Sequence, residues 1–122
     1  MRAKSGGFII AKTDASDSML AWGGYNKTIT GIVTNTSSST AVLDMDGIGN
    51  TPKIIEQCTG YTDSSYNVTG APAAEACVAF TFPSGQTGYL PALGEWDLAY
   101  DHKAAIVSAM TLIGGTAIKD DY

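Results

Sequence analysis

Glycine and proline interrupt this chain so often that its regular elements must be short. The 122 residues include 14 Gly and 4 Pro, which stop or redirect helices and strands at short intervals. Hydrophobic residues make up 44% of the chain and charged residues 16%, a mixture that excludes disorder, coiled coils and collagen. The pattern predicts a turn-rich globular chain that forms a single domain over residues 1–122, with a flexible N-terminus over residues 1–7.

The charge balance excludes some classes of binding partner. Seven Lys and Arg are outnumbered by twelve Asp and Glu, which gives a net charge of −5, and the basic residues are scattered singly. Binding to nucleic acid or to an anionic membrane surface needs a clustered basic face. No apolar run approaches the ~20 residues of a membrane span. We therefore expect no nucleic-acid partner and no membrane.

The first third of the chain has the pattern of short strands. Gly7–Lys12 and Met19–Trp22 are apolar runs separated by a polar cluster, and the second run stops at Gly23 and Gly24. This arrangement predicts a β-hairpin. Residues Thr28–Val33 form a third strand-like run before a polar loop.

Helices are expected after that loop. Asn50 and Thr51 precede Pro52 as a capping sequence, so a helix over Lys53–Thr59 is predicted. Pro72 begins a second helix that runs to Phe80. A third begins at Ala92, and a further helix covers Ala104–Ile113.

The helix after Ala92 is expected to be amphipathic. Three of its large side chains share one face and are assigned to the core, together with the residues just before it: Leu90, Pro91, Leu93, Trp96 and Tyr100. The opposite face carries polar side chains that we expect to be solvated: Glu95, Asp97, Asp101 and His102.

Asp44 and Asp46 form the most suggestive polar cluster. Alternating carboxylates before Gly47 can present oxygen ligands to Ca²⁺, but the EF-hand pattern requires an oxygen ligand and a Glu where this chain has Ile48 and Ile55. The alternative is a turn in which Asp and Asn cap backbone donors before the helix. Asp44 and Asp46 are thus weak metal candidates, and no metal or other cofactor is expected.

The two cysteines leave two interpretations open. Cys58 and Cys77 lie 19 residues apart without a nearby His or a CxxC motif, so neither a zinc site nor a redox pair is indicated. A single disulfide and two buried reduced thiols both remain possible.

Catalytic motifs are missing from the sequence. His102 is the only histidine, and although Asp101 adjoins it, a nucleophile and an orienting group would have to converge on it from elsewhere. The glycines form no phosphate-binding pattern. We expect a solvated His102 and no catalytic residue.

Aromatic residues offer the best candidates for binding. Trp22, Tyr25, Tyr61 and Tyr66 lie among Gly, Ser, Asn and Thr, which is the composition of an adaptable binding surface. The same residues are equally suited to closing the edge of a small core.

Several segments resemble a known family. Gly88–Trp96, Asp44–Thr51 and the pair Ala76 and Cys77 are similar, in order and spacing, to segments of a C-type-lectin-like family. This family occurs in bacterial surface proteins and in phage tail and receptor-binding proteins, and includes relatives of the formylglycine-generating enzymes. The resemblance covers roughly residues 8 to 118.

The resemblance implies an α+β fold of C-type-lectin-like type, with short antiparallel strands and two or three packed helices. The family's C-terminal strands, which carry its ligand-facing positions and the metal-binding cysteines of the enzymes, have no counterpart here, so the chain is expected to be the front portion of a longer fold. Neither Cys58 nor Cys77 then inherits a catalytic role, and the expected protein is not an enzyme.

The expected function is structural or adhesive. The resemblance implies a component of a phage tail fibre or virion appendage, or of a bacterial surface structure, that recognises a cell-surface glycan or protein. Its other partners would be virion or surface-structure subunits, including further copies in a homo-oligomer. The alternative is a structural assembly module that oligomerises through strand or helix contacts without binding a ligand.

Overall fold

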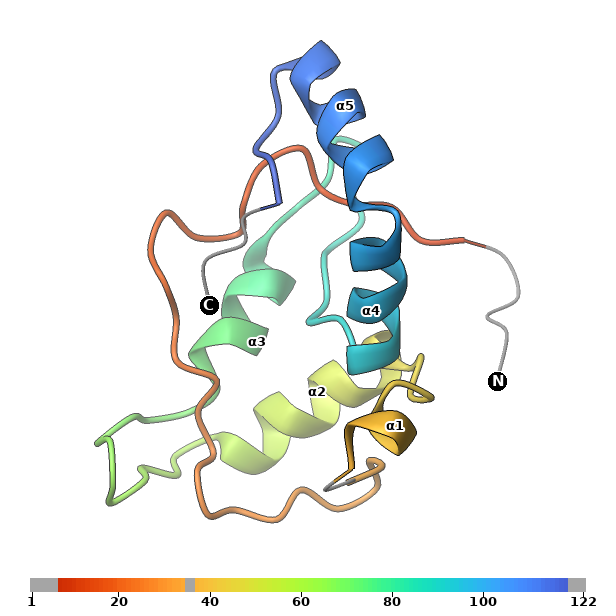
Figure 1. The fold of residues 1–122 in the computed structure, drawn as a ribbon. Coiled ribbons are helices and arrows are strands. Elements are labelled where there is room, and N and C mark those ends of the chain that lie inside the picture. Colours follow the sequence, from red (N-terminus) through yellow and green to blue (C-terminus); the bar gives the residue numbers. More distant parts are fainter. Residues whose placement is uncertain (1–6, 35–36, 119–122) are drawn as a thin grey trace.

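The computed structural model describes residues 7–34 and 37–118, which form helices joined by irregular chain (Figure 1). The helices of this described part are α1 (Ser38–Ala41), α2 (Gly47–Cys58), α3 (Pro72–Ala79), α4 (Leu93–Asp101) and α5 (Lys103–Ile113). Helix α2 packs against α3, and α4 meets α5 end to end (Figure 1). His102 alone joins α4 to α5, and the two helices follow one another along one side of the molecule (Figure 1).

The prediction of an α+β, C-type-lectin-like fold is wrong. The described residues contain no sheet, and their only β-type pairs are two isolated antiparallel bridges, Thr62 with Thr69 and Thr81 with Thr87. Each bridge closes a local turn and extends no further. In the described part, regular structure is mostly helical and strands are almost absent.

The predicted hairpin is also wrong. Gly7–Lys12 and Met19–Trp22 run as extended chain without pairing into a ladder, and the first crosses the α4–α5 junction before the chain descends past α3 (Figure 1). Thr28–Val33 forms no strand either. Strand propensity reflects packing on a neighbouring strand, and in the described part these runs form no ladder with another segment. Of the predicted flexible N-terminus, residues 1–6 lie outside the described part.

Helix α2 begins six residues earlier than predicted. The carboxylate of Asp46 accepts a hydrogen bond from Gly49 N (3.2 Å) and so caps the helix before Gly47. Pro52 therefore lies inside the helix and not at its first position. Only the carbonyl of Ile48 loses its helical partner, and Ile48 is exposed, so water can replace that bond.

The bounds of the later helices agree closely with the sequence. Helix α3 begins at Pro72 as predicted and ends one residue before Phe80. Helix α5 starts one residue before Ala104 and ends at Ile113, where Gly114 adopts a left-handed conformation (φ 67°).

The predicted orientation of α4 is wrong, because Glu95 was expected to be solvated and is buried. Glu95 is only 1% exposed, whereas Leu93 and Tyr100 are each more than two-fifths exposed. Gly94 explains this, because its amide donates to Asp44 O (2.9 Å) and a Cβ at this position would collide with the carbonyl oxygens of Val42 and Asp44. This close approach turns the face of Gly94, Glu95 and Ala99 inward.

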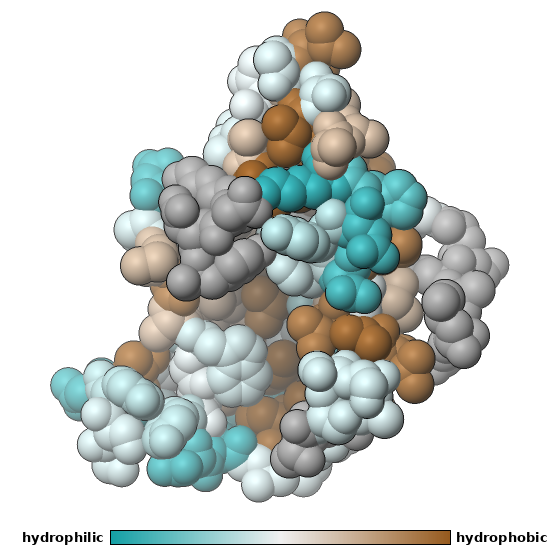
Figure 2. All heavy atoms as spheres, viewed as in Figure 1, coloured by the Kyte–Doolittle hydropathy of each residue, from teal (hydrophilic) through white to brown (hydrophobic). Residues whose placement is uncertain are grey.

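The hydrophobic core is small and lies around α2 and α3. Its buried members are Ile29, Ile54, Cys58, Ala71 and Ala74, with Ile32, Ile55 and Leu90 packed against them. In the described part, seventeen large hydrophobic side chains are exposed and seven hydrophobic residues are buried. Hydrophobic patches are accordingly visible between the polar areas of the surface (Figure 2). Many apolar side chains are therefore exposed and available for contact with another molecule.

Candidate functional site

Three tyrosines from two separate loops meet on one surface. The rings of Tyr25 and Tyr66 stack edge to face, with centroids 5.0 Å apart and planes at 83°. Tyr61 donates its hydroxyl hydrogen to Tyr25 O (2.8 Å), and Lys27 Nζ lies 5.0 Å from the centroid of the Tyr61 ring. We call Tyr25, Lys27, Tyr61 and Tyr66 the tyrosine cluster. The structure thus brings together three of the four aromatic residues selected from the sequence.

The tyrosine cluster faces solvent. Tyr66 is 69% exposed and Tyr25 is 48% exposed, while Tyr61 and Lys27 are half-buried beneath them. An edge-to-face pair contributes about 0.5–1.5 kcal/mol beyond its buried area, and the ammonium of Lys27 is attracted to the Tyr61 ring face. The rings therefore hold one another in place without being buried.

The loop that carries Tyr66 is fixed by a buried carboxylate. Asp63 is 2% exposed and accepts hydrogen bonds from the amides of Tyr66 (2.6 Å), Ser65 (3.1 Å) and Val68 (3.1 Å). These amide bonds, with that of Tyr66 foremost, hold the pKa of Asp63 below its usual range. Asp63 was not selected from the sequence, although an Asp that begins a polar turn is a recognisable signal.

The loop that carries Tyr25 is a tight turn. Lys27 N donates to Gly24 O (2.9 Å), and both Gly24 (φ 63°) and Asn26 (φ 62°) adopt left-handed conformations that Gly and Asn tolerate best. A Cβ on Gly24 would lie 2.8 Å from Cys58 Sγ. The turn therefore rests directly on the core.

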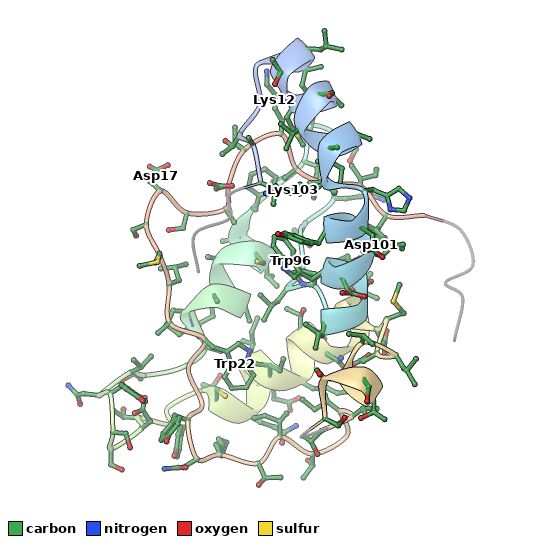
Figure 3. All side chains as sticks on the ribbon, viewed as in Figure 1. Lys12, Asp17, Trp22, Trp96, Asp101 and Lys103 are labelled. Carbon is green, nitrogen blue, oxygen red and sulfur yellow. The ribbon has the colours of Figure 1, made fainter. Side chains whose placement is uncertain are left out.

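Trp22 lies apart from the tyrosine rings. It is 46% exposed, its ring adjoins Gly24, and Figure 3 places it near the crossing of α2 and α3. Among the described residues, Trp22 makes no ring contact with Tyr25, Tyr61 or Tyr66. It borders the tyrosine cluster but is not a member.

Asp44 and Asp46 act as the capping residues of the turn before α2. Asp44 accepts hydrogen bonds from Asp46 N (3.0 Å) and Asn50 Nδ2 (2.8 Å), and Asp46 caps α2 through Gly49 N. No group of three or more His, Cys, Asp or Glu residues suited to a metal ion occurs in the described ranges. The geometry supports the capping interpretation of these carboxylates.

Cys58 and Cys77 are both free thiols, so the disulfide alternative is not realised. Cys58 is fully buried in the core and Cys77 is half-buried. Burial raises the pKa of both thiols, which disfavours the reactive thiolate.

His102 and Asp101 are exposed, as expected. The His102 ring Nδ1 lies 3.0 Å from the carbonyl oxygen of Leu98, four residues earlier. The imidazole therefore binds the end of its own helix.

A large apolar groove lies between the N-terminal segment and the helices. Its volume is about 1070 Å³. Its walls come from residues 7–15, the end of α3, the turn before α4, α4 itself and residues 116–118. Its apolar lining includes the side chains of Phe8, Ile9, Ile10, Phe80, Phe82 and Trp96. We call this feature the apolar groove. Sequence reasoning missed it, because it expected these segments to pair in a sheet or to fill a core.

Glu95 lies at the edge of the apolar groove and joins the start of α4 to the start of α2. Its Oε2 accepts from Gly47 N (3.1 Å) and Ala92 N (3.0 Å), and its Oε1 accepts from the Tyr89 hydroxyl (3.0 Å). The pattern of a glutamate three residues after the N-cap was a signal for this role. The buried carboxylate braces the groove wall.

Helices in the described ranges include none that is long and apolar enough to cross a membrane. Comparison with known proteins gives no assignment, because no family model, no curated protein and no solved structure matches the chain.

Proposed function

We propose that this chain is a non-enzymatic adhesive module whose tyrosine cluster binds a cell-surface glycan. The convergence of Tyr25, Tyr61 and Tyr66 from two separate loops carries the proposal. We place the module in a phage tail fibre, a related virion appendage or a bacterial surface structure. That placement rests on the resemblance of Gly88–Trp96 and Asp44–Thr51 to the family described above.

The chemistry of the tyrosine cluster suits a sugar. The flat, apolar face of a tyrosine ring packs against the C–H face of a pyranose, while hydroxyl and ammonium groups hydrogen-bond to sugar hydroxyls. Tyr66 and Tyr25 supply exposed rings, and Lys27 supplies a cation beside them. Tyrosine also loses little conformational entropy on binding, because it has only two side-chain torsions.

Preorganisation supports the same function. Asp63 fixes the backbone of the Tyr66 loop through three amide bonds, and the turn at Gly24 and Asn26 fixes Tyr25. Binding then requires little further ordering of either loop, which favours affinity. The helical fold removes the lectin-like sheet as a basis for recognition, so the glycan-binding part of the proposal depends on the tyrosine cluster alone.

We retain the non-enzymatic assignment because the side chains of His102 and Asp63 make structural contacts. His102 is the only histidine of the chain, and its ring contacts the Leu98 carbonyl. Asp63 is fully engaged with backbone amides. These contacts give both side chains structural roles.

An array of bacterial surface oligosaccharides tests the proposal directly. The full chain should bind at least one glycan, and Tyr66→Ala and Tyr25→Ala should each weaken binding by about tenfold or more, as expected for an aromatic contact at the centre of an interface. Tyr100→Ala is the matched control, because Tyr100 is about as exposed as Tyr25 (44% against 48%) and lies outside the tyrosine cluster. Circular dichroism verifies that each variant is folded.

Two outcomes would contradict the proposal. Equal losses in Tyr66→Ala and Tyr100→Ala would show that the tyrosine cluster has no special part in binding. A wild-type chain that binds no glycan, but binds a purified surface protein through Tyr25 and Tyr66, would move the ligand to the protein class.

A further inference from the structure

We infer that the tyrosine cluster binds acidic glycans in preference to neutral ones, and that Lys27 supplies the charge that binds the anionic group of the sugar. The inference rests on the proposed function, because it names the class of glycan that the same site takes. Three observations carry it: Lys27 has no ion-pair partner, backbone amides already bind the carboxylates of this region, and the cluster exposes two rings beside which a sugar can lie.

The ammonium of Lys27 makes no ion pair in the described part of the chain. Its contact is with the Tyr61 ring, whose centroid lies 5.0 Å from Nζ. A ring face attracts a cation, but it does not replace the charge-assisted hydrogen bond that an anionic oxygen accepts. Because a lysine ammonium has three donors, Lys27 can bind the ring and an anionic ligand together.

The position of Lys27 is set before a ligand binds. Its backbone N donates to Gly24 O (2.9 Å), which closes the tight turn described above. The side chain is half-buried, so its stem is packed while the ammonium is held over the Tyr61 ring. A lysine held in this way loses less conformational entropy on binding than a free one.

The two segments that carry the tyrosine cluster have one basic and one acidic residue. Over residues 23–30 and 59–70 these are Lys27 and Asp63. Asp63 is 2% exposed, and the amides of Ser65, Tyr66 and Val68 donate to its carboxylate. Its charge is therefore compensated by amide dipoles inside the loop, and it does not pair with Lys27.

Glu75, on α3, is a further carboxylate on this side of the core. Burial is the main cause of the raised pKa of Cys58, and the charges of Lys27 and Glu75 add opposite effects to it. Glu75 Oε1 accepts from Ala71 N (3.1 Å), and no ion pair joins Glu75 to Lys27 in the described ranges. The side chain of Glu75 is exposed, so water and salt screen its charge. The ammonium of Lys27 is therefore not neutralised by either carboxylate.

An acidic sugar uses these groups more fully than a neutral sugar. Tyr25 and Tyr66 are 48% and 69% exposed, and their rings pack equally well against acidic and neutral pyranoses. Only an anionic group gains the charge-assisted bond to Lys27, which is roughly twice as strong as a neutral hydrogen bond. Because the chain as a whole has a net charge of −5, it does not attract anions in general. The preference must therefore come from direct contact with Lys27.

Matched pairs of glycans test this preference on the full chain. The array should carry oligosaccharides of glucuronic, galacturonic and sialic acid, each beside its carboxyl-reduced form, in which a neutral CH₂OH group replaces the carboxylate. Sulfated oligosaccharides beside their desulfated forms distinguish a sulfate ligand from a carboxylate ligand. We expect the acidic member of a bound pair to bind about fivefold more tightly than its neutral form.

Variants of Lys27 assign the preference to its charge. Lys27→Gln should weaken binding of the acidic glycan by about fivefold and leave binding of its neutral form unchanged, while Lys27→Arg, which keeps the charge, should retain the preference. Lys103→Gln is the matched control, because Lys103 is also half-buried and lies over a tyrosine ring, that of Tyr100 (5.4 Å). This control removes the same charge outside the tyrosine cluster and should bind like the wild type.

Three results would overturn the acidic preference: equal binding of acidic and neutral forms, equal losses for both forms in Lys27→Gln, or the same loss in Lys103→Gln. Binding of a neutral glycan that Tyr66→Ala abolishes and Lys27→Gln leaves intact would overturn the preference but support the proposed function. A chain that binds no glycan of either kind would overturn both.

Discussion

Replacing Glu95 tests the most unexpected feature of the fold, the buried carboxylate between α2 and α4. Glu95 is 1% exposed and accepts at least three hydrogen bonds, from Gly47 N, Ala92 N and the Tyr89 hydroxyl. Glu95→Ala removes the acceptor of all three donors. Glu95→Gln keeps the shape and one carbonyl oxygen but removes the charge.

The expected losses of unfolding free energy follow from the burial of the three hydrogen-bond donors. Gly47 is buried, and a buried donor without a partner costs about 1–3 kcal/mol. Ala92 and Tyr89 are half-buried, so water partly replaces their bonds, at a cost of about 0.5 kcal/mol each. We therefore expect Glu95→Ala to lower the free energy of unfolding by about 3 kcal/mol. Glu95→Gln should lower it by about 1 kcal/mol, the difference between charged and neutral hydrogen bonds.

Urea unfolding followed by circular dichroism measures both changes. With a slope of about 1.5 kcal/mol per molar urea, the midpoint should fall by about 2 M for Glu95→Ala and about 0.7 M for Glu95→Gln. Asp97→Ala, on the exposed face of the same helix, should stay within about 0.5 kcal/mol of wild type. A Glu95→Ala variant as stable as Asp97→Ala would refute the buried brace.

Three further predictions concern other buried polar groups and the thiols. Thr51→Val should lower the free energy of unfolding by about 1–2 kcal/mol, and Thr51→Ser by less, because the Thr51 hydroxyl accepts from Leu90 N (3.0 Å) and both changes can be measured in urea. The lowered pKa of Asp63 means that its carboxylate stabilises the folded state above the unfolded pKa of about 4 and loses this effect as the pH falls through the folded pKa. The melting temperature of Asp63→Asn should therefore lie below that of wild type at pH 7, with a gap that narrows below about pH 4; a constant gap would refute the assignment. Cys77 should react with a thiol reagent before Cys58, because Cys58 is fully buried, and intact mass without reductant should show two free thiols; a mass lower by two hydrogens would contradict this.

Local signals predicted the later helices well. Pro72 and Gly114 mark the ends of α3 and α5 through backbone effects that depend on single residues: a fixed φ in one and a left-handed φ in the other. Three of the four aromatic candidates, Tyr25, Tyr61 and Tyr66, lie together in the structure. The sequence did not predict their meeting, because it depends on contacts between loops 36 or more residues apart. The composition of those loops indicated binding, but not which side chains would touch.

The remaining predictions were wrong because the structure there depends on contacts between residues distant in the sequence. The apolar runs Gly7–Lys12 and Met19–Trp22 have strand composition, but a strand needs a paired neighbour, and in the described part neither run forms a ladder. The inward face of α4 was misjudged because Leu93, Trp96 and Tyr100 are larger and more apolar than Gly94 and Glu95. Close backbone approach at Gly94 outweighed hydropathy, and no periodicity in the sequence contains that information.

Helix α2 connects the apolar groove to the tyrosine cluster. At its N-terminal end, Gly47 N binds Glu95, which borders the apolar groove. At its C-terminal end, Cys58 contacts the Gly24 turn that presents Tyr25. Twelve residues at 1.5 Å each separate the ends by about 18 Å, so the tyrosine cluster and the apolar groove lie near opposite ends of α2. The hydrogen bond from Gly47 N to Glu95 holds one end of α2, and the packing of Cys58 in the core holds the other. The position of Tyr25 relative to the groove is therefore set by a single helix.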